Sequence, residues 1–335
     1  MRFGVIFDVH VSDKPPATRK DNYKEAILRK LDFIISNSNT LKYDAILMVG
    51  DLFHKKIPSH NSHSLVSSLI KVFEKSKAPI YIIAGNHDIL GNITNLWQQP
   101  LAVLEQAGVL KILDNGEPIV FEDEKGLTIS LNGHSFNAML DKKDQIELYN
   151  LNHLEDSNCK ISLFHQMILP DGMKFFSDYV NFSDLLNVNA DILIDGHYHV
   201  GFNPSVQMIQ NKYFINGGAL SRGSSEQFNL EKEPSYVELT IEAGLDGTFS
   251  LSSEDIVVPF EPSDKVFDTV AIKRKKETKE LKDFIQNLSE FETQSLSSQS
   301  PEGVLRLLEL MGMEEGLRSL AEPYLVSAYE KLENN

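Results

Sequence analysis

The sequence predicts an α/β fold with largely buried strands and a second, more antiparallel sheet. Up to Asp195, short apolar runs rich in β-branched residues alternate with helical patterns, which is the order expected of layered α/β proteins. After Asp195, short strands joined by Gly and Asn turns follow one another. The 335 residues are 41% hydrophobic and 24% charged, which is enough apolar material for one large domain and a smaller one.

Each expected strand of the first part is an apolar run bounded by a turn or by polar residues. These runs lie at 2–7, 44–49, 79–84, 127–132, 160–164 and 191–194. Apolar residues at helical spacing predict helices between them, at 22–36, 62–76, 95–107 and 142–151. The strands of the later part are expected at 206–209, 212–215, 236–241 and 248–252.

Two prolines, Pro259 and Pro262, mark a domain boundary, so residues 1–258 are expected to form the main domain. Residues 259–293 should carry one strand, at 267–272, followed by a basic run and a helix. The Ser- and Gln-rich stretch 294–300 predicts a linker, and residues 301–335 predict terminal helices with two apolar stripes.

Composition excludes several classes of protein. No apolar run approaches the roughly 20 residues of a membrane span, and the first residues lack the apolar region of a signal peptide. Cys159 is the only cysteine, so no internal disulfide can form and a cytoplasmic location is expected. The formal net charge of −16 argues against a free-standing nucleic-acid-binding protein, although bound divalent cations would reverse the sign locally.

Polar residues that can bind metals follow five of these strands directly. They are Asp8-Val9-His10, Gly50-Asp51-Leu52-Phe53-His54, Gly85-Asn86-His87-Asp88, His165 and Gly196-His197-Tyr198-His199. Ligands bind beyond the carboxyl ends of the strands in open α/β sheets, so these strand ends should share one rim. The expected metal ligands at that rim are Asp8, His10, Asp51, Asn86, His165, His197 and His199.

The ligand types indicate which metal the rim would bind. Carboxylates, imidazoles and an amide oxygen suit manganese, zinc or iron, whereas an all-oxygen set would suit magnesium or calcium. A carboxylate such as Asp51 can bridge two ions. Two ions about 4 Å apart can clamp a phosphate, activate a water and stabilise the leaving oxygen. The sequence therefore predicts two divalent ions, with manganese favoured.

Over roughly residues 1–225 the five motifs together resemble the calcineurin-like metallophosphoesterase superfamily. That resemblance implies a two-sheet αββα sandwich with a small C-terminal capping segment. The run from Gly50 to His54, followed by Pro58-Ser59, is similar to the SbcD-type nucleases. Those nucleases work with an SbcC-type coiled-coil ABC ATPase in double-strand-break repair and recombination, and residues 266–288 resemble the start of their DNA-capping domain.

The resemblance also implies a role for each residue of the rim. Asp8, His10, Asp51 and His199 would hold one ion, and Asp51, Asn86, His165 and His197 the other. Among the catalytic residues, His87 would stabilise or protonate the leaving group and Asp88 would orient His87 through its other ring nitrogen. His54 would contact the scissile phosphate.

Basic and small residues close to these motifs are candidate DNA contacts. They are Lys14, Arg19 and Lys20 after the first motif, Lys55 and Lys56 beside His54, and Ser221 and Arg222 after a glycine turn. That turn reads Asn216-Gly217-Gly218-Ala219, where the family usually has Pro-Gly-Ser, and a glycine turn can still approach a phosphate closely.

The favoured function is a metal-dependent DNA exo/endonuclease, but alternatives stay open. A phosphomonoesterase is less favoured, because Ala84 and Leu52 stand where such enzymes carry arginines for a dianionic phosphate. A small phosphodiester such as a cyclic nucleotide is harder to exclude. A non-catalytic scaffold would have no need for seven converging ligands.

The partners expected are DNA and the ATPase subunit. Residues 277–335 carry more acidic than basic side chains and should repel DNA, yet their apolar stripes must be buried. The stripes could dock on the ATPase, which would then supply the basic surface, or could pack on this chain's own core. The resemblance also allows a homodimer.

Overall fold

The computed structural model describes residues 1–16, 19–91, 93–244, 247–268 and 270–274, together with 278 and 323–324. The chain divides into two compact units, Met1–Phe267 and Asp268–Asn335. The predicted linker 294–300 lies outside the described residues, as does nearly all of 301–335. The predicted domain limits therefore stay predictions.

The first sheet carries the N-terminal strand at its centre. Its order is β14-β13-β1-β2-β3-β4, in which β1 to β4 are parallel and β13 and β14 are antiparallel additions. The bounds are β1 Arg2–Ile6, β2 Ala45–Val49, β3 Ile80–Ile83, β4 Lys111–Ile112, β13 Ser235–Ala243 and β14 Phe249–Val257. Both faces of β2 are buried, which explains its continuous apolar run.

The second sheet has the order β11-β12-β10-β7-β6-β5, with a parallel centre and two antiparallel edges. The bounds are β5 Ile119–Glu122, β6 Thr128–His134, β7 Cys159–Phe164, β10 Ile192–Asp195, β11 Val206–Ile209 and β12 Lys212–Ile215. A two-stranded sheet joins β8 Ile168–Leu169 to β9 Val180–Asn181.

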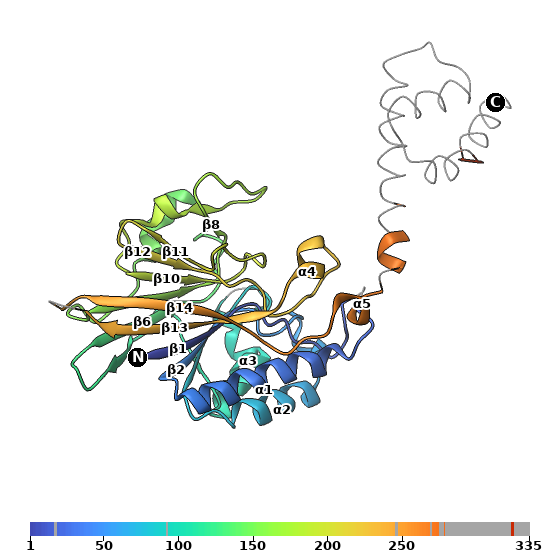
Figure 1. Cartoon of the computed structure of the whole chain (residues 1–335), viewed down its shortest axis with the longest axis horizontal. Helices are drawn as coiled ribbons and strands as arrows, with labels where there is room; N and C mark the ends of the chain where they lie inside the picture. The colour runs from blue at the N-terminus through green and yellow to red at the C-terminus, as the bar shows by residue number, and fades with distance from the viewer. Residues whose placement is uncertain are drawn as a thin grey trace, which may run out of the picture. The chain divides into compact units, whose positions relative to one another are not determined.

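Helices cover the first sheet on the face opposite the second sheet (Figure 1). They are α1 Tyr23–Leu41, α2 His63–Phe73 and α3 Pro100–Gln106, with the short helices η1 Pro58–His60 and η2 Ile93–Gln98 beside them. Asn22 and Ser62 cap α1 and α2 by accepting from Glu25 and Leu65 amides. Four further short helices of the first unit are η3 Lys143–Tyr149, η4 Phe182–Leu185, α4 Gln227–Glu231 and α5 Ser263–Val266.

Three apolar clusters separate the layers. Ile46 and Met48 of β2 face Ile27 and Leu31 of α1, while Leu47 of the same strand faces the other sheet. A third cluster packs Phe182 and Tyr149 against the outer face of the second sheet. The αββα sandwich is therefore confirmed, and none of the helices in the described part of the chain is long and apolar enough to span a membrane.

The sequence predicts a second, more antiparallel sheet for the strands after Asp195, but these strands do not form a sheet of their own. β11 and β12 extend the second sheet, whereas β13 and β14 cross to the first and pair with β1. The apolar residues of each strand can be buried in either sheet. The pattern therefore predicts that a strand forms, but not which strand it pairs with. The strand predicted at 267–272 is also wrong: Phe267 makes one antiparallel bridge with Arg19, and residues 270–274 are helical.

Two arginines tie the end of the first unit to its beginning. Arg19 pairs with both carboxylate oxygens of Asp21, at 2.8 and 2.6 Å, and donates to the Arg222 carbonyl at 2.9 Å. Its guanidinium also lies 5.2 Å from the ring centre of Phe267. Arg222 is buried as well and donates to Ser263 and to the Glu261 carbonyl.

These contacts correct three predicted DNA contacts. Arg19, Ser221 and Arg222 are all buried, and Ser221 donates to the Asp8 carbonyl at 3.4 Å. Their charge and polarity made them candidate DNA contacts, but these properties alone do not distinguish a solvated arginine from one buried against aromatic rings and carbonyls.

Replacing Arg19 should destabilise the first unit without touching the rim. Arg19→Ala removes the hydrogen bonds that the guanidinium donates to Asp21 and to the Arg222 carbonyl. One hydrogen bond to a charged group is worth about 1.5–3 kcal/mol, so the free energy of unfolding should fall by at least that amount. Lys20→Ala, at an exposed neighbouring side chain, is the matched control and should change it by less than about 0.5 kcal/mol. Denaturant unfolding of both variants measures the difference, and equal stabilities would contradict the structural role.

Candidate metal centre

Left-handed backbone turns place the candidate ligands at the rim. Asp8, His10, Asp51 and His197 have φ values of 42°, 50°, 49° and 66°, and each follows the end of β1, β2 or β10. Side chains other than glycine adopt this region rarely, at a cost of about 1–3 kcal/mol each. The chain therefore leaves each strand by a strained turn that directs a ligand toward the shared edge.

Two glycines let the strand ends approach the ligands closely. A Cβ atom added at Gly50, where φ is 81°, would lie 2.4 Å from Nδ1 of His165. A Cβ atom at Gly85 would lie 2.2 Å from Oδ1 of Asp51. Both contacts are too short for any side chain, so the glycines that precede Asp51 and Asn86 are required by packing at the site.

The four residues predicted for the first ion do come together. One ligand atom from each of Asp8, His10, Asp51 and His199 lies within 4.8 Å of the others. Nε2 of His10 is 3.4 Å from Oδ2 of Asp51, and Nε2 of His199 is 3.4 Å from Oδ1 of Asp8. These residues lie in the segments that follow β1, β2 and β10, so both sheets contribute.

His165 connects this group to the residues predicted for the second ion. Its Nε2 atom lies 3.4 Å from Oδ2 of Asp51 and 3.2 Å from Oδ1 of Asn86. Its Nδ1 atom donates to the Val49 carbonyl at 2.8 Å, which leaves the Nε2 lone pair for a metal when the imidazole is neutral. The ring of His197 is 5.1 Å from that of His165. Asp51 is therefore common to both groups.

The electrostatics of the rim favour a bound cation. Burial raises the pKa of Asp51, but the charge of the neighbouring His165 outweighs it and holds that pKa well below its usual range. Burial lowers the pKa of His165, but Asp51 and Asp8 outweigh it and raise the value to about 10. Burial lowers the pKa of His10 to about 3, which keeps this imidazole neutral and able to bind a metal.

Unpaired buried atoms fit the same interpretation. Among the described residues, Asp8 Oδ2, His10 Nδ1 and Asp51 Oδ2 are buried and make no hydrogen bond. The Nε2 atoms of His10 and His199 face each other at 2.9 Å. Leaving such groups unsatisfied costs about 1–3 kcal/mol each. Several atoms that each bind one ion at about 2.0–2.2 Å must lie close to one another. The 2.9–3.4 Å distances between the ligand atoms of this group meet that condition, so the donor set fits a divalent metal.

Asp88 does not orient His87, contrary to the prediction. Its carboxylate accepts from the backbone amides of Leu52, Phe53 and Gly85 at 3.1, 2.9 and 3.0 Å. His87 instead donates from Nδ1 to the His54 carbonyl at 2.8 Å. Adjacent side chains point in different directions, so Asp88 is buried beneath the loop while His87 faces the rim. Asp88 thus holds the loop that carries Asp51 and His54.

His54 and His87 lie beside the first group of ligands. Their rings stack at 5.7 Å, and the His10 ring is 4.9 Å from that of His87. Burial, assisted by the charge of Lys55, lowers the pKa of His54 to about 4. Lys14, Lys20, Lys55 and Lys56 are exposed, as a substrate contact requires.

Two residues at the rim had not been anticipated. The amide of Asn216 donates to the Tyr198 carbonyl at 3.2 Å and its oxygen accepts from Gly218 at 2.7 Å, which fixes the turn carrying His197 and His199. Lys232 donates to the His199 carbonyl at 3.4 Å, and burial lowers its pKa to about 8. The Asn-Gly-Gly turn was a usable signal for Asn216, whereas nothing near Lys232 in the sequence indicated its position.

Residues 1–201 match the family model for calcineurin-like phosphoesterases. The chain belongs to the calcineurin-like phosphoesterase family. It is thus a member of a family of hydrolases that use divalent metals, and its cluster of Asp8, His10, Asp51 and His199 lies where the ends of β1, β2 and β10 converge.

More distant similarities extend over different parts of the chain. A DNA double-strand break repair protein Mre11 from Archaeoglobus fulgidus is 25% identical over 132 residues, which are 38% of this chain and 28% of that protein. The match thus spans less than a third of this relative's length. The calcineurin-like phosphoesterase YfkN from Bacillus subtilis has a TM-score of 0.46 at 14% identity, covering 83% of this chain and 97% of that one. A dimetal phosphatase from Danio rerio has a TM-score of 0.46 at 11% identity, covering 77% and 99%.

Asp51 should be indispensable for metal binding, because both groups of ligands share it. Asp51→Ala, prepared with excess manganese and then desalted, should retain less than one ion per chain. Asp156→Ala, at an exposed acidic side chain away from the rim, is the control and should retain the wild-type amount. Mass spectrometry measures the metal content of both variants. Two ions bound to the Asp51 variant would refute the proposal that both groups of ligands depend on Asp51.

Proposed function

We propose that this chain is a metal-dependent DNA nuclease that hydrolyses phosphodiester bonds. The observation that carries the proposal is Asp51, shared between two groups of ligands and bordered by His54, His87 and exposed lysines. Bound divalent ions would neutralise the charge of a phosphate ester and activate a water nucleophile. Asp8, His10, Asp51 and His199 would hold one ion, and Asp51, Asn86, His165 and His197 the other.

The positions of the arginines favour a diester over a monoester. A phosphate monoester carries close to two negative charges at neutral pH, whereas a diester carries one. Arg19 and Arg222, the two arginines that were candidate substrate contacts, are both buried and already bonded to structural partners. Similarity to a DNA double-strand break repair protein supports DNA as the substrate.

His87 is proposed to protonate the leaving oxygen, and His54 to contact the scissile phosphate. Because Nδ1 of His87 is held by the His54 carbonyl, the opposite nitrogen is the one that would exchange a proton with substrate. The same hydrogen bond couples the two histidines, so a shift of the His54 loop would misplace both groups.

Cleavage should need both a transition metal and His87, and loss of His87 should not affect metal binding. Chelated protein should be inactive on double-stranded DNA and should recover with manganese better than with magnesium. His87→Ala should keep its metal but lose about 10² to 10⁴ in kcat. Parallel assays with p-nitrophenyl phosphate and a cyclic nucleotide test the alternatives. Faster turnover of either compound than of DNA would reject the nuclease assignment.

The ATPase partner remains a proposal, and it concerns residues 301–335, nearly all outside the described part of the chain. Its basis is the net charge of −16, which leaves this chain in need of a basic surface from elsewhere, and the apolar stripes of the terminal segment. If those stripes dock on a coiled-coil ABC ATPase, deleting 301–335 should abolish co-purification with it. Manganese-dependent cleavage of short single-stranded DNA should persist. Normal binding of the truncated chain, or its unfolding, would contradict docking.

A further inference from the structure

A cavity of about 640 Å³ lies next to the metal rim. Its walls come from the loops that follow β1 and β2, so Ser12 is two residues beyond His10 and Lys55 directly follows His54. The two loops are joined, because Val11 pairs with Phe53 and the His54 amide donates to the Val11 carbonyl at 2.9 Å. The volume falls within the about 300–1,000 Å³ of sites for small molecules.

Two lysines bring positive charge to the cavity. Lys14 and Lys55 both line it, and within the described residues neither ammonium group makes an ion pair or a hydrogen bond. The one carboxylate in the lining, Asp13, is already occupied. It accepts from Lys24 at 3.0 Å and from the amide and hydroxyl of Ser62 at 2.9 Å each.

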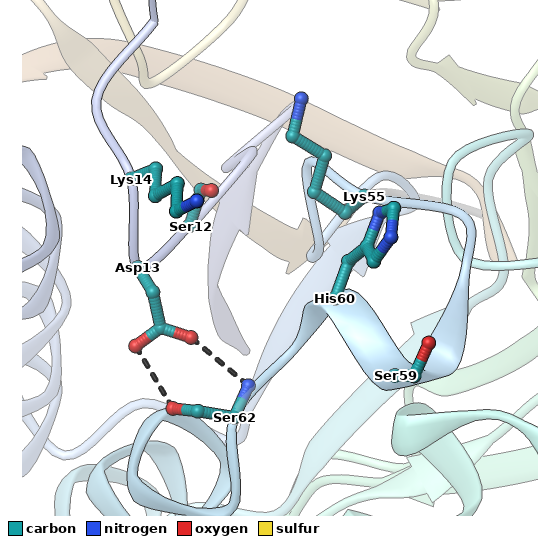
Figure 2. Close-up of a pocket in the computed structure, with 7 residues that line it drawn as sticks. All are labelled: Ser12, Asp13, Lys14, Lys55, Ser59, His60 and Ser62. Carbon is teal, nitrogen blue, oxygen red and sulfur yellow. Dashed lines mark hydrogen bonds between the residues drawn. The ribbon is translucent and has the colours of Figure 1, made fainter.

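Figure 2 shows how these groups lie. Asp13 is turned toward Ser62, at the start of α2, whereas the Lys14 side chain runs toward Ser12 and the Lys55 side chain extends away from His60. Hydroxyl groups of Ser12 and Ser59 add neutral donors to the lining. The charge of Lys55 also reaches His54, since it contributes to the lowered pKa of that histidine. The cavity and the rim are therefore electrostatically linked.

Two ammonium groups and two serine hydroxyls in the lining of one cavity match a phosphate dianion better than a diester. A terminal phosphate monoester has a second pKa near 6 and so carries about two negative charges at neutral pH. We propose that this cavity binds a terminal phosphate on the nucleotide next to the scissile bond, held by Lys14 and Lys55. The inference rests on the proposed function, and it makes a phosphorylated DNA end the preferred substrate.

Dinucleotides of thymidine test the preference directly. The substrates are TpT, the 5′-phosphorylated pTpT and the 3′-phosphorylated TpTp, each assayed with manganese. The wild-type kcat/KM for one phosphorylated form should exceed that for TpT by about tenfold or more, and which form is preferred identifies the end that the cavity reads. In Lys14→Ala/Lys55→Ala the ratio should fall to near one. Lys125→Ala, at an exposed lysine between β5 and β6, should keep the wild-type ratio.

A binding experiment separates this inference from the proposed function. Calorimetric titration of chelated protein with thymidine 5′-monophosphate, thymidine 3′-monophosphate and thymidine reports on the cavity, because the chelated rim holds no divalent ion to attract phosphate. One monophosphate should bind, thymidine should not, and each lysine substitution should weaken binding by about tenfold. Binding without DNA cleavage would reject only the nuclease. DNA cleavage with no phosphate preference and no phosphate binding would overturn the cavity's role.

Discussion

The buried carboxylate of Asp51 is the constraint on which the rest of the site depends. One oxygen accepts from the His87 amide at 2.7 Å, and the other faces His10 and His165 at 3.4 Å each. Those three partners come from three different strand ends, in both sheets. A buried charge of this kind is stable only when it is paired, so the fold must bring cationic groups to it.

Among the described residues, the groups that the fold brings to Asp51 are imidazoles at strand ends, not arginine or lysine side chains. Parallel strands bring several polar turns to one edge, and Gly50 and Gly85 allow these turns to approach within contact distance. The strain of the left-handed residues Asp8, His10 and Asp51 is held by the packing of both sheets. In the described part of the chain, this arrangement leaves buried oxygen and nitrogen atoms of the site without hydrogen bonds, and divalent cations could bind to these atoms.

The sequence predicts the ligands well because their position depends on a local rule. A polar residue directly after a buried parallel strand must lie at the carboxyl edge, so the residues expected for the first ion converge as anticipated. Predictions failed where the outcome depended on distant partners. Burial of Arg19 depends on Phe267 and Arg222, far along the chain, and the partners of β13 depend on which sheet edge is free.

The error at Asp88 has a different cause. A carboxylate next to a histidine suggests a pair, but consecutive side chains seldom face the same way, and three backbone amides compete for the same oxygens. The two neighbours therefore differ in position, because Asp88 holds the loop from beneath and His87 faces the rim. Similarly, the loops after β1 and β2 place Lys14 and Lys55 in one cavity only because Val11 and Phe53 pair.

The central claim is that Asp51 stands between two metal ions. The most direct measurement is an anomalous difference map from crystals of the full chain grown with manganese. Two peaks should appear, each within about 2.0–2.3 Å of an Asp51 carboxylate oxygen, one toward His10 and His199 and the other toward Asn86 and His165. A single peak, or peaks that lie away from Asp51, would contradict the account.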